Sequence, residues 1–418
     1  MLERTSRLLR IALIVPLLGL LPGVSTGAEP NDFPHFVAHA QDIFQGKGDD
    51  FASYVALHDA YDRLTPAARK GAGQLLSMID AMYGRYDDAS RHYADTFPAK
   101  VPPLCPSGPY AQTPLDAAIL TVAARSRVLL INESHSMVQT RAAIIELLPT
   151  LRKAGFTDLA LEALNPANAD SLINAPAGAG RSALPDDIKA GFYLREPVYA
   201  RMVENAKSLG FGLVAYESED VDHQRREAQQ ADHLQAWLNL HPKGRLLVIA
   251  GYSHIWKNEG WMAEKLMAST GGAVVSIDQI DGLGGCRGPK PAAVPSLWLS
   301  SAGQAWTLHP ERVDATVTWR TSDRRGHAST WLSLGGMRKP VSVPSACHGK
   351  RPCLVEATRD DARGGVPEDR LVTFKASESS ILYVTPGNYI VVERTLKDVR
   401  RRSLDVQRDG TPVWKLLP

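Results

Sequence analysis

An unbroken apolar run that ends in ionisable residues places the tightest constraint on the fold of this chain. Residues 128–131 are Val, Leu, Leu and Ile, a pattern typical of a strand buried on both faces in a parallel sheet. Residues 137–153 then repeat apolar side chains at the spacing of an amphipathic helix, and Gly155 follows as a stop. Glu133 and His135 are therefore expected on a strand-to-helix turn.

The same pattern recurs further along the chain, with ionisable residues at or just beyond the end of each apolar run. Residues 159–161 lead to Glu162, residues 213–216 lead to Glu217, and residues 246–250 lead to Gly251, Tyr252, Ser253 and His254. The carboxyl ends of parallel strands meet at one edge of an open α/β sheet, where ligands bind. We therefore expect one cluster at that edge, made of Glu133, His135, Glu162, Glu217 and His254.

A chain of 418 residues is long for one domain and suits two or three. We expect an α/β fold whose mostly parallel sheet is covered by helices, at residues 101–285. Helical periodicity predicts a helical region, similar to a tetratricopeptide hairpin, at residues 29–100. Short β-like runs predict a β-rich C-terminal module at residues 295–418, with sandwich-like character.

Two finer expectations concern loops and turns. Residues 165–190 show no clear period and are rich in Ala, Asn, Gly and Pro, which indicates a lid, a binding loop or a disordered segment. In the C-terminal module, residues 385–388 (Thr-Pro-Gly-Asn) separate two β-like runs, residues 381–384 and 389–392. This is good turn chemistry, so we predict a β-hairpin there. Residues 315–319 are assigned to the same module.

The first 28 residues have the form of an export signal. Three Arg precede an apolar run at residues 11–24 that is too short to span a bilayer comfortably, and small residues lead up to Ala28. We expect cleavage after Ala28, a periplasmic or secreted location, and no transmembrane span in the mature chain. No Cys lies near this site to carry a lipid anchor.

Charge and cysteine count limit the functions of the mature chain. Loss of the signal removes three Arg and one Glu, which leaves a net charge of zero and no support for nucleic-acid binding. Four Cys in an oxidising compartment favour two disulfides. We pair Cys347 with Cys353 across a short loop and, by elimination, Cys105 with Cys286. The alternative is a metal site formed by Cys347, Cys353 and His348.

Two His and several carboxylates can perform hydrolysis in two ways. As ligands, His135, Glu162 and His254 suit a divalent metal such as Zn, Mn or Fe with an open position for water. Without a metal, a carboxylate orients His135 or His254 as a general base, and Arg226 stabilises the oxyanion. No Gly-x-Ser-x-Gly elbow or candidate Cys nucleophile is present.

The order of short motifs NESH, LALE, AYE, RRE and GYSH resembles a superfamily that joins erythromycin esterases, ChaN haem-binding lipoproteins and Tiki/TraB proteins. The resemblance covers residues 115–280. It assigns the opening acid and histidine to Glu133 and His135, the internal acid to Glu162, an Arg beside an acid to Arg226 and Glu227, and the closing motif to Gly251 and His254. Asn132 stands where the family opens with Gly, and the Cys of the ChaN lipoproteins is absent.

The resemblance and the residues together favour an exported hydrolase of an ester, lactone or amide bond, acting on a small-molecule or peptide substrate. Its catalytic residues would be Glu133, His135, Glu162, Arg226 and His254. The alternative is a ChaN-like haem or iron binder, for which Tyr216, Glu217 and Tyr252 are the candidate cofactor-binding residues. A third hypothesis is a non-catalytic interaction protein that uses its helical and β-rich flanks.

Overall fold

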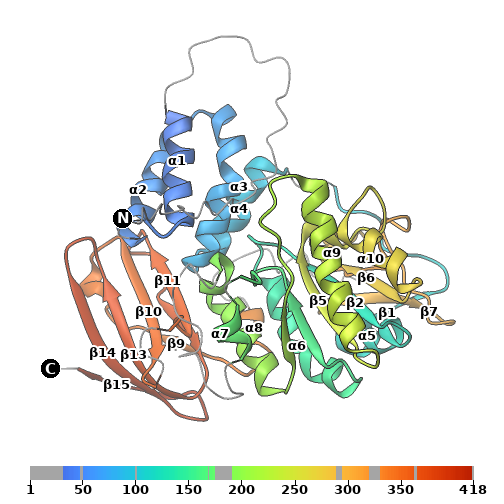
Figure 1. Cartoon of the computed structure of the whole chain (residues 1–418). Helices are drawn as coiled ribbons and strands as arrows, with labels where there is room; N and C mark the ends of the chain where they lie inside the picture. Colours follow the sequence, from blue (N-terminus) through green and yellow to red (C-terminus); the bar gives the residue numbers. More distant parts are fainter. Residues whose placement is uncertain are drawn as a thin grey trace, which may run out of the picture.

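The computed structural model describes residues 32–47, 50–98, 101–167, 169–174, 191–288, 294–319, 330–361 and 365–416. The expected export signal lies outside these residues, as does most of the segment 165–190. Figure 1 shows an α/β unit on the right, a bundle of helices at the upper left and an antiparallel β unit at the lower left. The predicted mixed α/β fold class is confirmed.

A six-stranded sheet forms the centre of the α/β unit, in the order β4-β3-β5-β2-β6-β8, and each pair of neighbouring strands is parallel. Its strands are β2 (Val128–Glu133), β3 (Asp158–Leu161), β4 (Gly212–Ala215), β5 (Leu246–Gly251), β6 (Val274–Asp278) and β8 (Ala315–Thr316). The placement of β8 corrects the assignment of residues 315–319 to the C-terminal module. The chain returns to the sheet at β8, where Ala315 pairs with Ile277 and extends the edge formed by β6.

Helices cover both faces of this sheet, as Figure 1 shows. They are α5 (Leu115–Ala123), α6 (Gln139–Lys153), α8 (Pro197–Ser208), α9 (His223–Leu240) and α10 (Met262–Thr270), with the short α7 (Asp170–Ile173). Leu129 and Ile131 point toward α5, α6 and α8, whereas Val128 and Leu130 point toward α9 and α10. Burial on both faces explains why β2 and β5 lack polar alternation.

Four helices at the N-terminal end form the bundle: α1 (Asp32–Phe44), α2 (Asp50–Arg63), α3 (Pro66–Met82) and α4 (Tyr86–Thr96). Helix α3 begins as its sequence indicates, because Thr65 Oγ1 accepts a hydrogen bond from Ala68 N at 3.2 Å and Pro66 occupies the first turn. Among the described residues, none of the helices is long and apolar enough to cross a membrane.

The C-terminal residues form an antiparallel β unit. A five-stranded sheet has the order β11-β10-β13-β14-β15, and β12 pairs with β9 in a second, two-stranded sheet. The strands are β9 (Lys339–Ser342), β10 (Cys353–Arg359), β11 (Asp369–Thr373), β12 (Ile381–Val384), β13 (Gly387–Arg394), β14 (Val399–Val406) and β15 (Pro412–Leu416). Val341, Leu382, Val355 and Leu404 share one core, so the two sheets pack face to face. A separate ribbon joins β1 (Tyr110–Pro114) to β7 (Ser296–Ser300).

The predicted hairpin between β12 and β13 is wrong. Strand β12 pairs with β9, where Leu382 lies opposite Val341. Strand β13 pairs with β10 on one edge and with β14 on the other, so neither of its edges is free for β12. The residues 385–386 between the two strands therefore carry the chain from one sheet to the other.

Both predicted disulfides are present, and together they use all four cysteines of the sequence. Cys105–Cys286 joins the two ends of the α/β unit across 181 residues, whereas Cys347–Cys353 closes a loop of 6. The alternative metal site at Cys347, Cys353 and His348 is wrong, because its two sulfurs are bonded to each other. Two disulfides fit a protein of an oxidising, extracellular compartment.

Removing the long-range disulfide is expected to destabilise the protein more than removing the short one. Chain-entropy arguments assign about 5 kcal/mol to the closure of the long loop and about 2 kcal/mol to the short one. Urea unfolding of Cys105→Ser/Cys286→Ser and of Cys347→Ser/Cys353→Ser measures this difference. Equal losses in the two double variants would contradict the prediction.

Candidate active site at the carboxyl edge of the sheet

The carboxyl ends of four neighbouring strands, β4, β3, β5 and β2, carry the candidate residues. Parallel pairing in matched register brings the turns that follow these strands to one rim of the sheet. The structure brings the five predicted side chains together there, in contact with one another directly or through Arg226 and Gly251: Glu133, His135, Glu162, Glu217 and His254.

His135 is held by a chain of buried charges. Its Nδ1 lies 2.7 Å from Oε1 of Glu133, the last residue of β2. Arg141 Nε donates to the other oxygen of Glu133 at 2.7 Å, and Arg141 Nη1 donates to Glu196 Oε2 at 3.2 Å. Arg141 comes from α6, and Glu196 caps the start of α8 through the backbone N–H groups of Val198 and Tyr199. Two helices on one face of the sheet thus fix the orientation of the imidazole.

The ionisation of Glu133 defines the tautomer of His135. Burial alone would raise the pKa of Glu133, but the adjacent Arg141 and His135 hold this pKa below its usual value. A carboxylate at this position accepts a hydrogen bond from the Nδ1–H group of His135, the tautomer in which Nε2 is the free acceptor. This is the arrangement that a general base requires.

Two tyrosines enclose the ring of His135. Tyr193 stacks on it with a centroid separation of 4.2 Å, and Tyr252 meets its edge at 5.0 Å. Tyr252 has a φ of 44°, which is an uncommon backbone conformation for a bulky side chain. Such outliers persist where the surroundings hold them, and they cluster at functional sites. The side chain of His135 keeps 13% exposure between these walls.

Glu162 and His135 meet over Gly251. The backbone N–H of Gly251 donates to Glu162 Oε2, and a Cβ at this position would lie 2.6 Å from His135 Cε1, 2.8 Å from His135 Nε2 and 3.2 Å from Glu162 Oε2. The φ of Gly251 is −75°, which any residue adopts, so the glycine is required for space and not for backbone freedom.

Replacing Gly251 with Ala is therefore expected to displace His135 from Glu133. A methyl group inside van der Waals contact forces shifts that cost about 1–3 kcal/mol. We expect activity to fall by about 100-fold, because a misplacement near 1 Å has that effect on catalysis. Steady-state kinetics with a parallel unfolding curve measure both effects, and an unchanged kcat/KM would contradict the expected clash.

Arg226 connects the remaining acids. From the first turns of α9, its Nε and Nη2 donate to the two oxygens of Glu217 at 3.0 Å and 2.5 Å, and Nη2 also donates to Glu162 Oε1 at 2.9 Å. Burial alone would raise the pKa of Glu162, but His254, Arg226 and His135 lower it well below its usual value. The planar guanidinium fork matches two carboxylates in a way that a Lys ammonium would not.

His254 lies between two acids and beside Arg226. Its Nδ1 is 2.9 Å from Glu227 Oε2, and its Nε2 is 3.4 Å from Glu162 Oε1 and 3.1 Å from Arg226 Nη1. Burial alone would lower the pKa of His254, but Glu162 and Glu227 outweigh this effect and raise the pKa to about 10. The ring is therefore an imidazolium at neutral pH, and it adds a second cation to that of Arg226.

The raised pKa of His254 predicts a pH-dependent contribution to stability. Because the folded-state pKa lies above that of an unfolded His, the contribution is complete below pH about 6.5 and is lost as pH rises toward about 10. Urea unfolding of the wild type and of His254→Gln at a series of pH values measures this contribution. The stability difference between them should shrink from pH 7 to pH 10, and a constant difference would contradict the assignment.

The three candidate cofactor-binding residues lie in different surroundings. Tyr216 is fully buried, and its hydroxyl donates to Ile249 O at 2.8 Å, so it belongs to the core beneath the site. Glu217 binds Arg226 and also accepts from Gln230 Nε2 at 2.8 Å. Tyr252 forms a wall of the His135 site, as described above.

Helix α3 of the bundle supports the same site from outside the sheet. Ser77 and Ser136 hydroxyls lie 2.7 Å apart, and Ser136 is the residue after His135. Met78 Sδ accepts from the hydroxyl of Tyr193, the residue that stacks on His135, at 3.6 Å. Successive residues of α3 thus contact the turn that carries His135 and the tyrosine that stacks on its ring.

The sequence interpretation missed Arg141, Glu196 and Tyr193. For Arg141 a signal was available, because this Arg falls among the apolar positions of its helix, on the face that packs against the sheet. An Arg on such a face needs a buried acid, and Glu133 is eight residues earlier. Glu196 stands before a Pro, where capping acids occur, but nothing in the sequence joins it to His135.

Comparisons with known proteins leave this chain without an assigned family. No family model and no curated protein matches the sequence. Among solved structures, the chain matches a crystal structure of the C-terminal region of Pasteurella multocida toxin, described as having a thiol-protease-like catalytic triad, at 10% identity and a TM-score of 0.31. The match covers 93% of this chain and 61% of the toxin chain. A score of this size establishes neither a shared fold nor a shared activity.

Proposed function

We propose that this protein is a hydrolase of ester, lactone or amide bonds, in which His135 is the general base. The observation that carries the proposal is the orientation of His135: Glu133 holds Nδ1 at 2.7 Å, while Nε2 faces Glu162 across Gly251. A base must present one free nitrogen toward a water molecule and have its other nitrogen oriented by an acid. The resemblance to the erythromycin esterases agrees with this role.

The proposed reaction uses His135 as the base and the two cations, Arg226 and His254, as stabilisers of negative charge. His135 Nε2 removes a proton from a water molecule, and the water oxygen attacks the carbonyl carbon of the substrate. The negative charge then forms on the carbonyl oxygen, where Arg226 and the protonated His254 supply positive charge in a largely buried setting. Collapse of this intermediate expels the leaving group, which receives a proton from the His135 imidazolium.

Thiol chemistry has no available nucleophile, because both pairs of cysteines are disulfide-bonded. This leaves activated water as the nucleophile that the described site supports best. Glu133 then orients the base, and Arg141 holds Glu133 in its ionised state. We infer that these two residues position His135 without touching the substrate.

A divalent Zn, Mn or Fe ion held by His135, Glu162 and His254 does not fit this arrangement. Arg226 already contacts both Glu162, at 2.9 Å, and His254, at 3.1 Å, so its guanidinium supplies the cation at the place where the ion would lie. Bringing in a metal would first require Arg226 to leave two carboxylates. We therefore derive no step through a metal at this site.

The haem hypothesis has less support from the contacts. An axial Tyr or His needs a free ligand atom beside an apolar wall. The Tyr216 hydroxyl is bonded to Ile249 O, and both ring nitrogens of His254 lie against charged side chains. The hydrolase is therefore the function that we put forward, in an extracytoplasmic compartment where the two disulfides persist.

A substrate panel tests the proposal. Activated aryl esters, lactones and aryl amides are assayed in buffer treated with a chelator, with the wild type and with His135→Ala. We expect hydrolysis of at least one class, resistance to the chelator, and loss in the variant. Activity equal in the two proteins would exclude the role of His135. Activity that is lost with the chelator and restored by a metal that the double variant His135→Ala/His254→Ala no longer binds would overturn the metal-free reaction.

A further inference from the structure

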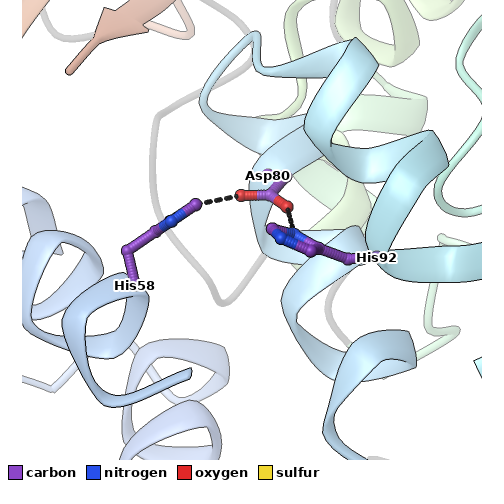
Figure 2. A group of neighbouring side chains, drawn as sticks. All are labelled: His58, Asp80 and His92. Carbon is purple, nitrogen blue, oxygen red and sulfur yellow. Dashed lines mark hydrogen bonds and ion pairs between the residues drawn. The ribbon is translucent and has the colours of Figure 1, made fainter. Parts of the chain in front are cut away.

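A second cluster of metal-binding side chains lies in the helical bundle, apart from the sheet edge. His58 on α2, Asp80 on α3 and His92 on α4 converge on one point between the three helices (Figure 2). His58 Nε2 lies 2.8 Å from Asp80 Oδ1, and His92 Nδ1 lies 2.6 Å from Asp80 Oδ2. Three helices thus each contribute one donor group to the same small volume.

The cluster is largely removed from solvent. The side chain of Asp80 is fully buried, that of His92 keeps 6% exposure and that of His58 keeps 13%. Tyr54, also buried, donates its hydroxyl to Asp80 Oδ1 at 2.8 Å. A buried acid of this kind is costly unless it has a function or a full set of partners.

We propose that His58, Asp80 and His92 bind a divalent transition-metal ion, with Zn²⁺ the best fit. Within the part of the chain that the structure describes, this is the only group of three or more His, Cys, Asp or Glu residues whose ligand atoms all lie within 4.8 Å of one another. Two imidazoles and one carboxylate form a set that suits Zn²⁺, and water can take the fourth position.

The geometry requires little rearrangement. Ligand atoms about 2.0–2.1 Å from a tetrahedral Zn²⁺ lie about 3.4 Å from one another. The present separations of 2.8 Å and 2.6 Å run to the two oxygens of Asp80 and are somewhat shorter, so an ion would move the two rings outward from the carboxylate. Both rings would bind as neutral imidazoles, His58 through Nε2 and His92 through Nδ1. Tyr54 would remain as a hydrogen-bond donor that orients Asp80.

The main effect of the ion would be on the structure of the helical bundle. It would join α2, α3 and α4, and α3 also carries Ser77 and Met78, which contact the turn of His135 through Ser136 and Tyr193. Asp80 lies less than one turn after Ser77 on the same helix. Metal binding to the bundle would therefore rigidify the helix that supports His135, without placing the ion at the reacting atoms.

Metal titration of the full-length protein tests this site. Protein purified without metal-affinity steps is stripped with a chelator and titrated with Zn²⁺ by calorimetry, and with Co²⁺ by visible absorption. We expect one tightly bound metal ion per chain, a Co²⁺ spectrum typical of tetrahedral coordination and a rise in Tm on binding. The matched control is His35→Ala, an exposed His on α1 of the same bundle, which should bind as the wild type does.

Variants separate this site from the proposed active site. Loss of an outer-shell partner weakens metal binding by about 10–100-fold, so removal of a ligand in His58→Ala or His92→Ala should weaken it by about 100-fold or more. The double variant His135→Ala/His254→Ala should still bind one metal ion tightly. If that double variant loses it and His58→Ala keeps it, the proposal is overturned in favour of a metal at the sheet edge.

The wild type alone also decides the question if a variant fails to fold. X-ray absorption at the zinc edge should show two imidazole nitrogens and oxygen ligands, with no sulfur. If the wild-type protein binds Zn²⁺ no more tightly than an exposed surface site does, so that a weak chelator removes the ion, the cluster is only a hydrogen-bonded network. Neither result depends on hydrolytic activity, so this proposal can fail while the proposed function stands.

Discussion

Replacing His135 with Ala is expected to lower kcat/KM for hydrolysis by about a hundred- to ten-thousand-fold, the range that a general base contributes. The loss should appear in kcat more than in KM, because the base acts in the transition state and not in substrate binding. Stability should change little, since Glu133 keeps its bond to Arg141 at 2.7 Å when the imidazole is absent. Steady-state kinetics and an unfolding curve for the same preparation measure both quantities.

Chemical rescue distinguishes a base from a merely structural His. Added imidazole can occupy the space between Tyr193 and Tyr252 and should restore part of the activity of His135→Ala, with a dependence on the concentration of neutral imidazole. His35→Ala, on the surface of α1, serves as the control and should show neither loss nor rescue. Full activity of His135→Ala, or a loss explained entirely by unfolding, would exclude the base.

Glu133→Gln probes the orienting acid in the same series. The amide has one acceptor oxygen and can accept from only one of His135 Nδ1 and Arg141 Nε, and the neutral side chain no longer stabilises the imidazolium that forms during proton transfer. We expect a smaller loss than for His135→Ala and a shift of the acidic side of the pH profile toward lower pH, because the imidazolium loses the carboxylate that stabilises it. A profile identical in shape to the wild type would show that Glu133 has only a packing role.

The sheet edge could be predicted from the sequence because parallel strands obey a simple rule. Each of β2, β3 and β5 contains an unbroken apolar run whose end is visible in the sequence, and right-handed crossovers bring such ends to one side. Glu133, Glu162 and His254 followed from that rule alone. The disulfides followed from cysteine number and spacing in the same way.

Features that depend on partners distant in sequence could not be predicted. The hairpin between β12 and β13 had suitable turn residues, but both edges of β13 were taken by β10 and β14, which no local pattern reveals. The cluster of His58, Asp80 and His92 was missed because each residue lies on a separate helix with no motif in common. Local rules therefore give elements and their ends, whereas the choice of partners depends on the whole chain.

The two cationic residues at the start of α9 offer a test in which neighbours in sequence should behave oppositely. Arg226 contacts Glu162 and Glu217 and keeps 13% side-chain exposure, whereas Arg225 pairs with Asp220 on the surface and keeps 65%. Arg226→Met is expected to cost about 3–5 kcal/mol of unfolding free energy, because it leaves Glu217 without its cation and Glu162 with His254 alone. Arg225→Met should have an unfolding midpoint close to that of the wild type, because exposed ion pairs contribute little.

A second substitution shows whether the loss in Arg226→Met comes from uncompensated charge. If it does, Glu217→Gln in the Arg226→Met background should recover part of the stability. Glu217→Gln alone should be destabilising. An effect of Glu217→Gln on stability that changes sign with the residue at position 226 indicates that the two residues are coupled. Arg226→Lys keeps the charge but cannot reach both oxygens of Glu217 and Glu162 at once. Its stability should therefore lie between that of the wild type and that of Arg226→Met. Urea unfolding of the four variants and the wild type at pH 7 measures the cycle. Arg226 and Arg225 variants of equal stability would mean that the acids at the carboxyl edge are not held by Arg226, and the oxyanion contact proposed for it would then lose its structural basis.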